Sequence, residues 1–398
     1  MVADRFSALA ELAVHGVNVQ PGQVVAVGAE LGQEELVRAI AVAAYGRGAK
    51  FVDALYFDPW VKRARIQHAD PETLAFVPEW YGSRLLALAE QGDARISITG
   101  IVSPDALAGV DPTLSGRDRL PWIKEIGRVV SERSTNWTVV PCPHPVWAKL
   151  VYPDLGEEQA YEKLWDELWH ILRLDEPDPG AAWDERAADL KARGAALTER
   201  GFDSLELAGP GTELTVGLLP TSAWGAGDFT TRAGLRHFPN LPTEEVFTTP
   251  DPTRTQGHVT STKPLVLKDG TIIRGLRVRF EDGRAVEVDA DENGGALRAQ
   301  TESDEGASRL GEVALVDRKG RIGPLGTVFY DTLLDENSAS HIALGHGFAF
   351  AVGEEDRLRI NDSAIHVDFM IGSSELEVTG VTPDGERVPV LRGGDWQV

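Results

Sequence analysis

Apolar residues in the first half of the chain alternate between helical spacing and short continuous runs. Helical spacing is found in residues 1–20 and again in residues 33–47, where apolar side chains recur every three or four positions. Continuous apolar runs at 24–28 and 51–56 flank the second of these segments. A strand, a helix and a strand in this order predict a βαβ unit, whose two strands pair in parallel.

The same pattern continues to roughly residue 200. Apolar runs at 94–100 and 135–140 predict two more strands, and helical spacing follows at 157–172 and 181–200. These segments predict an α/β N-terminal domain with a mainly parallel sheet.

A change in composition marks the end of this domain. Eight of the ten tryptophans lie between Trp60 and Trp183, and the sequence Pro177-Asp178-Pro179-Gly180 is typical of a turn. We therefore predict a first domain at residues 1–190 and a second domain at residues 191–398.

The second half consists of short strand-like segments and turn signals. Apolar or alternating segments lie at 204–207, 213–218, 271–280 and 284–288. Asp269-Gly270 and Asp282-Gly283 are typical of tight turns. Helical spacing in this half is confined to 294–300, 303–309 and 339–343. The pattern predicts a mostly antiparallel, β-rich α+β C-terminal domain.

The composition excludes several classes of protein. The 39 basic and 62 acidic residues give a net charge of −23, which disfavours nucleic-acid binding because phosphate contacts need clustered Lys and Arg. Cys142 is the only cysteine, so the chain forms neither an intrachain disulfide nor a thiolate metal cluster. The apolar runs are too short to span a membrane, and residues 1–5 contain no apolar signal core. These features predict a cytoplasmic protein with no nucleic-acid or membrane partner.

Two adjacent carboxylates, Glu244 and Glu245, lie in the segment NLPTEEVFTTP, between a proline turn and a run that favours a strand. Successive side chains of a strand point to opposite faces, so one glutamate points into whatever the strand lines and the other points away. Relief of the repulsion between them requires a cation, a proton or solvent. A divalent cation with oxygen ligands is one explanation, and a solvated acidic edge strand is the other.

Two further segments carry a carboxylate or a histidine at ligand-like positions. Glu312 precedes the hydrophobic run of LGEVALV, and we expect it at the head of a strand. In the sequence DENSASH, Asn337 or Ser338 is suited to cap a helix. This cap predicts Glu336 in the preceding loop and His341 about one turn into the helix.

His366 and Asp368 alternate with apolar residues in IHVDF, so they share one face of a predicted strand. An imidazole and a carboxylate on one face form a bidentate corner for a metal such as Zn or Co, although the same pair also forms ordinary surface hydrogen bonds. The whole set holds more ligands than one tetrahedral ion uses, and two ions that share a bridging carboxylate would use them all.

Four ordered blocks of the chain resemble the signature sequences of the thermophilic aminopeptidases, the M29 family of metallopeptidases. These blocks are NLPTEEVFTTP, LGEVALV, FYDTLLDENSASHIALG and IHVDFMIG. The early segment VQPGQVVAVGA is similar to the family's N-terminal domain, so the resemblance covers nearly the whole chain.

The resemblance implies a dinuclear metal-dependent aminopeptidase that uses two divalent ions (Zn, Co or Mg) to remove N-terminal residues from peptides. The implied metal ligands are Glu245 (favoured over Glu244), Glu312, Glu336, His341, His366 and Asp368. Glu312 is expected to bridge the two ions, and Glu244 or Glu312 to transfer the proton to the leaving amine. Members of the family form homodimers, which implies a homodimer here.

One position departs from the family pattern. Family members carry a tyrosine seven residues after the histidine of the HIALG block, where it assists catalysis, and this chain has Phe348 at that position. A phenyl ring cannot donate a hydrogen bond to a developing oxyanion. Either His346 or Tyr330 replaces this donor, or turnover is reduced.

Two other functions fit parts of the pattern. A mononuclear non-haem Fe(II) ring-cleaving dioxygenase needs two histidines and one carboxylate, which His341, His366 and Asp368 supply, but it would leave the remaining glutamates unpaired. A catalytically impaired binding protein is the second alternative, because Phe348 replaces the expected tyrosine. The metal content per chain and the release of N-terminal residues distinguish these functions.

Overall fold

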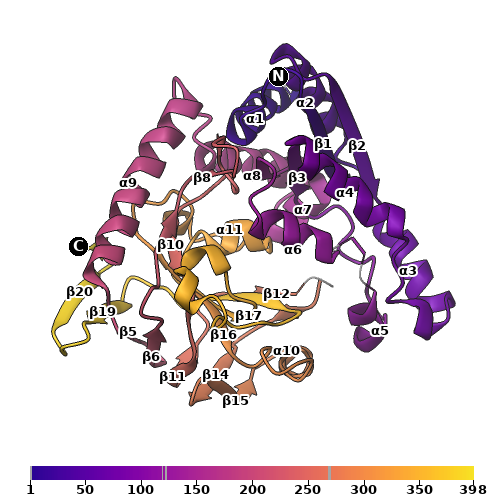
Figure 1. Ribbon diagram of the computed structural model, residues 1–398. Coiled ribbons are helices and arrows are strands. Elements are labelled where there is room, and N and C mark those ends of the chain that lie inside the picture. Colours follow the sequence, from indigo (N-terminus) through magenta and orange to yellow (C-terminus); the bar gives the residue numbers. More distant parts are fainter. Residues whose placement is uncertain (1, 119, 122, 268–269) are drawn as a thin grey trace. The chain divides into compact units, whose positions relative to one another are not determined.

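The computed structural model describes residues 2–118, 120–121, 123–267 and 270–398 (Figure 1). The chain divides into two compact units. The first unit holds Met1–Asp184 and Asp228–Thr243, and the second holds Glu185–Gly227 and Glu244–Val398. Residues 228–243, which follow the predicted boundary at 190/191 in sequence, thus cluster with the first unit. Within the described residues, no helix is both long and apolar enough to cross a membrane.

The first unit is built on a four-stranded sheet with the order β2-β1-β3-β4, in which every pair is parallel. Its strands are β1 (Val24–Glu30), β2 (Phe51–Phe57), β3 (Ala94–Thr99) and β4 (Trp137–Pro141). Alternate side chains of β1 and β3 are buried, because both strands lie in the middle of the sheet. The predicted βαβ unit and its parallel pairing are confirmed.

Helices precede, connect and follow these strands. They are α1 (Val2–Val17), α2 (Glu34–Gly46), α3 (Pro59–His68), α4 (Glu79–Gln91), α5 (Pro112–Arg117), α6 (Lys124–Ser131), α7 (Pro145–Val151) and α8 (Glu157–Ile171). The local sequence explains where α3 begins, since the Asp58 side chain accepts a hydrogen bond from Trp60 N and Pro59 occupies the first turn. A small ladder of β8 (Phe229–Thr230) and β9 (Arg236–His237) completes the unit. The long helix α9 (Pro179–Arg200) leads into the second unit.

The second unit contains an eight-stranded antiparallel sheet with the order β15-β14-β11-β6-β5-β19-β20-β21. Its strands are β5 (Ser204–Gly209), β6 (Thr212–Leu218), β11 (Pro250–Thr260), β14 (Arg277–Glu281), β15 (Arg284–Asp289), β19 (Glu377–Val381), β20 (Arg387–Arg392) and β21 (Asp395–Trp396). Asp282 and Gly283 form the predicted turn between β14 and β15, both with positive φ. In the other predicted turn, Asp269 lies outside the described residues, while Gly270 has a φ of 83°.

A second, five-stranded antiparallel sheet has the order β18-β17-β16-β10-β7. Its strands are β7 (Gly225–Ala226), β10 (Glu245–Thr248), β16 (Leu310–Val316), β17 (His341–Gly345) and β18 (His366–Met370). Every residue of β16 and β17 is buried, and apolar side chains of this sheet join those of the eight-stranded sheet in one hydrophobic core. The pair β12 (Leu265–Val266) and β13 (Ile272–Ile273) and the helices α10 (Gly294–Thr301) and α11 (Thr332–Glu336) complete the unit. The predicted fold class of both halves is confirmed.

Two predicted helices of the second half are wrong. Residues 303–309 form turns and bends, and residues 339–343 contribute to strand β17 instead of a helix. Asn337 follows the C-terminal end of α11, whose N-cap is Asp331, so Glu336 ends a helix and His341 begins a strand. The reason is that a short apolar run such as Ile342-Ala343-Leu344 fits a buried strand as well as a helix, and only pairing with β16 and β18 decides between them.

Glu30, at the end of β1, should make stability depend on pH. Burial, with a contribution from Asp58, raises its pKa from 4.5 to about 7. The unfolded chain loses this proton at a lower pH than the folded chain does. Ionisation of Glu30 therefore leaves the free energy of unfolding unchanged well below pH 4.5, and lowers it by the full amount above pH 7. We expect Glu30→Gln to raise the free energy of unfolding at pH 8 by about 1–3 kcal/mol, and by less at pH 5.

Urea unfolding of both proteins at the two pH values measures this difference. Glu90→Gln, on the exposed surface of α4, is the matched control and should leave stability unchanged at either pH. An equal effect of Glu30→Gln at pH 5 and pH 8 would contradict the assignment.

Candidate metal centre

Four neighbouring strands carry most of the sequence-predicted ligands. Glu245 begins β10, Glu312 lies near the start of β16, His341 begins β17, and His366 and Asp368 lie on β18. The antiparallel register pairs Ala343 on β17 with both Glu312 and Asp368. Residues that are up to 123 positions apart in the sequence are therefore brought together by strand pairing.

A bulge in β16 directs Glu312. The register between β16 and β17 shifts between Leu310 and Glu312, and such bulges re-aim side chains beside functional sites. Gly311 is required at this point, because a Cβ atom there would lie 2.3 Å from the Gly345 carbonyl oxygen and 2.4 Å from that of His346.

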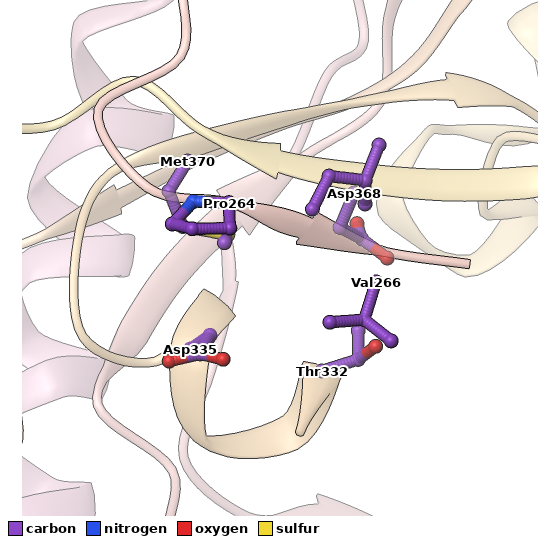
Figure 2. A pocket seen from close by; sticks show the side chains of 7 residues that line it. Pro264, Val266, Thr332, Asp335, Asp368 and Met370 are labelled. Carbon is purple, nitrogen blue, oxygen red and sulfur yellow. The ribbon is translucent and has the colours of Figure 1, made fainter. Parts of the chain in front are cut away.

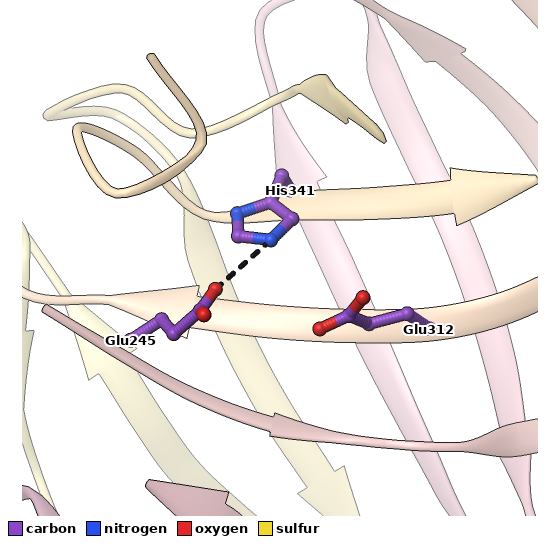
Figure 3. A group of neighbouring side chains, drawn as sticks. All are labelled: Glu245, Glu312 and His341. Atoms are coloured by element: carbon purple, nitrogen blue, oxygen red, sulfur yellow. Dashed lines mark ion pairs between the residues drawn. The ribbon is translucent and has the colours of Figure 1, made fainter. Parts of the chain in front are cut away.

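The first group of ligand atoms comes from Glu245, Glu312 and His341, and Figure 3 shows these side chains pointing toward one another. His341 Nε2 lies 3.1 Å from Glu245 Oε2, and the candidate ligand atoms of the three residues all lie within 4.8 Å of one another. Glu245 Oε2 is buried, and the His341 imidazole is its ion-pair partner. Carboxylate oxygens and an imidazole nitrogen gathered in this way are ligand types that a divalent cation could bind.

The second group comes from Glu312, His366 and Asp368. His366 Nε2 lies 3.1 Å from Glu312 Oε2 and 3.2 Å from Asp368 Oδ1. Glu312 therefore belongs to both groups.

Backbone carbonyls orient both imidazole rings. His366 Nδ1 lies 2.9 Å from the His346 carbonyl oxygen, and His341 Nδ1 lies 3.1 Å from that of Ala339. A carbonyl oxygen only accepts, so each Nδ1 donates a hydrogen bond and each Nε2 faces the carboxylates. Histidines that bind metals are commonly held by such a contact of the other ring nitrogen.

The charges of the centre shift the pKa values of its members. Burial raises the pKa of Glu336 well above its usual value, and the nearby carboxylates of Asp368 and Glu245 add to this effect. Burial also raises the pKa of Glu312, against the opposing effect of His366. Burial alone would lower the pKa of His341, but the Glu245 carboxylate raises it to about 10. The buried carboxylates thus favour bound protons or nearby positive charge, and divalent cations could supply that positive charge.

The structure does not bring Glu244 into either group. Its carboxylate accepts a hydrogen bond from Arg186 Nε at 2.6 Å, and its side chain is fully buried. Glu336 is the last residue of α11 and belongs to neither group of close ligand atoms, although its charge interacts with Asp368, Glu245, His341 and Glu312. Arg186 escaped the sequence analysis because nothing local to α9 distinguishes it from the other arginines of that helix.

A small pocket borders the centre at Asp368 (Figure 2). It lies between β12, α11 and β18 and is lined by Pro264, Leu265, Val266, Thr332, Asp335, Asp368 and Met370. Asp335 accepts hydrogen bonds from the backbone of Phe329 and Asp331, and burial raises its pKa to about 6. Asp368 is the residue that this pocket shares with the second ligand group.

An aromatic cluster contacts His366. The ring of Phe348, where the resemblance leads us to expect a tyrosine, is 5.2 Å from the His366 ring and stacks on Phe350 at 5.3 Å. Phe247, two residues after Glu245 on β10, packs edge-on against both phenyl rings. Of the two suggested replacement donors, His346 lies 3.4 Å from Asp362, and Tyr330 lies beneath the Arg274 guanidinium at 5.8 Å.

Comparisons with known proteins identify the family of the chain. The model of the thermophilic metalloprotease family (M29) matches residues 2–396. Aminopeptidase T of Thermus aquaticus is 42% identical, with 99% of each chain covered, and aminopeptidase 2 of Geobacillus stearothermophilus is 39% identical, covering 97% of this chain and 96% of its own. The structure of wild-type AmpT from Thermus thermophilus is similar with a TM-score of 0.91 at 40% identity, over 100% of both chains. The chain therefore belongs to the thermophilic metalloprotease family M29, as its sequence predicts, and is a metallopeptidase.

Proposed function

We propose that this metallopeptidase is an aminopeptidase that binds two divalent cations (Zn, Co or Mg) and removes N-terminal residues from peptides. The observation that supports two cations is the position of Glu312 in both ligand groups. A carboxylate shared by two sets of ligands is what a bridged pair of cations needs, whereas a single iron bound by two histidines and one carboxylate would leave the buried Glu245 without a counter-charge.

The proposed ligands are Glu245, Glu312, Glu336, His341, His366 and Asp368, with Glu312 as the bridge. Bound cations supply a water of lowered pKa and polarise the scissile carbonyl. A Glu312 oxygen that is not held by a cation would accept a proton from the attacking water as the water oxygen joins the carbonyl carbon. Glu312 would then give this proton to the leaving amine as the C–N bond breaks. Glu312 is preferred to Glu244 in this role because the Glu244 carboxylate is held by Arg186. The acidic side chains of the centre also hold the substrate's free ammonium group.

The number of bound ions tests the shared position of Glu312. After dialysis against metal-free buffer, we expect elemental analysis to find about two divalent ions per wild-type chain. His341→Ala and His366→Ala should each retain about one ion, while Glu312→Ala should lose both, since each set of ligands needs Glu312. Activity is measured as the release of N-terminal residues from aminoacyl chromogenic substrates. All three variants should lose more than the roughly 10–100-fold that is typical when a residue hydrogen-bonded to a metal ligand is replaced.

His258→Ala, on the exposed surface of β11, is the matched control and should keep both ions and full activity. Chelator should abolish turnover, and added Zn, Co or Mg should restore it. One ion per wild-type chain, or a Glu312→Ala variant that retains one, would contradict the shared bridge.

The Phe348 position should limit turnover. A donor aimed at the developing oxyanion is worth roughly 100–1,000-fold in kcat, and the Phe348 ring already lies against His366. We expect Phe348→Tyr to raise kcat by about 10-fold or more, while KM changes little. Phe350→Tyr adds the same hydroxyl to the stacked neighbouring ring and should have no such effect. Equal kcat values for Phe348→Tyr and wild type would indicate that another group supplies the donor.

We also propose a homodimer in which strand β2 contributes to the interface. β2 is an edge strand of its sheet, and unpaired edges that bear apolar side chains pair readily with another chain. Phe51 and Leu55 point to the same side of β2 and are 55% and 41% exposed. The adjacent Tyr45, whose hydroxyl accepts from Val52 N, is 50% exposed.

A cytoplasmic location and the absence of nucleic-acid and membrane partners remain the predictions from composition.

Sedimentation velocity tests the interface. We expect the wild-type chain to sediment as a dimer, and the double variant Phe51→Glu/Leu55→Glu as a monomer, because paired charges at β2 would repel. Val286→Glu, at an exposed apolar position on β15, should remain dimeric. A wild-type monomer, or a dimer that survives the double substitution, would contradict the proposed interface.

A further inference from the structure

A buried arginine bridges two carboxylates directly beside the metal centre. Arg186, on α9, donates from Nε to Glu244 Oε2 at 2.6 Å and from Nη2 to Asp317 Oδ1 at 2.7 Å. The side chains of Arg186, Glu244 and Asp317 are only 6%, 0% and 1% exposed. The group is therefore an ion-pair network inside the protein, well separated from solvent.

Glu244 and Asp317 lie next to the paired residues of β10 and β16 that include the proposed ligand Glu245. Glu245 on β10 is the register partner of Val316 on β16, so Glu244 and Asp317 come immediately before and after that pair in their strands. Without Arg186 between them, two buried negative charges would repel each other at this end of the sheet.

Successive side chains of an extended segment point to opposite sides. Glu244 accordingly faces Arg186 while Glu245 faces His341. The orientation of one carboxylate therefore fixes the orientation of the other, because both depend on the rotation of the same short backbone segment.

Hydrogen bonds extend this network to the other ligand-bearing elements. Glu244 N donates to Asn337 Oδ1 at 2.7 Å, and Asn337 Nδ2 donates to the Leu333 carbonyl oxygen at 2.9 Å. Asn337 directly follows Glu336 in the chain. The backbone of β10 is thus tied to the C-terminal end of α11.

A further bond reaches β17. Val316 N donates to Ser340 Oγ at 3.1 Å, and Ser340 directly precedes His341. The ends of β10, β16, α11 and β17 meet around the ion-pair network, and each of these elements carries a proposed ligand.

Buried ion pairs add little net stability, because desolvation offsets most of their attraction, and replacement by apolar side chains is often neutral. What such a network contributes is a defined geometry. We infer that Arg186 is a positioning residue for the metal centre: by bridging Glu244 and Asp317 it sets the strand ends that hold Glu245 and His341 and the helix end that holds Glu336. This inference rests on the proposed metal centre and concerns residues outside its ligand set.

The test separates metal affinity from stability. We compare wild type with Arg186→Met, which keeps the length of the side chain without its charge, and with Arg186→Lys, which restores the charge but not the two-pronged contact. The affinity for Zn is measured by competition with a chromogenic chelator, and the free energy of unfolding of the metal-free protein by urea. Asp189→Ala removes the partly exposed partner that Arg186 contacts at 3.2 Å and serves as the matched control.

We expect Arg186→Met to weaken Zn binding by roughly 10–100-fold, the range seen when residues that support metal ligands are replaced. Arg186→Lys should recover part of this loss, and Asp189→Ala should bind Zn like wild type. Because Arg186→Met leaves two buried carboxylates unpaired, the metal-free variant should also unfold at a lower urea concentration. Zn affinity is therefore compared in buffer without urea, under conditions in which each variant is folded. If Arg186→Met does not fold, Glu244→Gln, which keeps the shape but removes the charge, should show the same weakening.

Wild-type Zn affinity in the folded Arg186→Met or Glu244→Gln variant would overturn the inference and leave the proposed function in place. A loss of Zn affinity that appears only where the metal-free variant is partly unfolded would also overturn it. A wild-type chain that binds no divalent cation would instead overturn the proposed metal centre, and the role of Arg186 with it.

Discussion

The mutual repulsion of buried carboxylates is the constraint on which the second unit depends. Glu245, Glu312 and Asp368 are all at least nine-tenths buried, and Glu336 adds its charge to theirs. Two imidazoles do not balance this charge, and the raised pKa values of Glu312 and Glu336 express the imbalance. A fold that concentrates acids in this way is under electrostatic strain unless protons or cations accompany them.

The antiparallel sheet makes this concentration possible because its hydrogen bonds do not involve the side chains. Strands β16 and β17 are buried along their whole length, so their apolar residues anchor them in the core while single polar residues project from them. A bulge at Gly311 and carbonyl contacts to both histidine rings then refine the direction of each ligand. Rigid strands hold such a constellation more accurately than loops would.

Two chemically different sets of residues surround the centre, an ion-pair network and an aromatic cluster. Arg186 compensates two carboxylates that do not belong to the ligand groups. Near His366, the stacked rings of Phe348 and Phe350 offer no hydrogen-bond donor, where the resemblance to the family leads us to expect a tyrosine. Carboxylates and imidazoles that could hold cations are thus brought together, while the aromatic residue beside them is not the expected one.

The sequence by itself determined what depends on local order. Periodicity was sufficient for the βαβ unit, the parallel sheet and the β-rich second half, and the four signature blocks were sufficient for the family. The alternation of strand side chains implied that Glu244 and Glu245 face opposite ways, but not which one faces the histidines. Only the tertiary structure decided that Glu245 does, because the phase of β10 is set by its pairing with β16. The same long-range pairing made a strand of residues 341–345, brought Glu312 between two ligand groups and buried Arg186 beside them. Such contacts join residues far apart in sequence, and no local pattern records them.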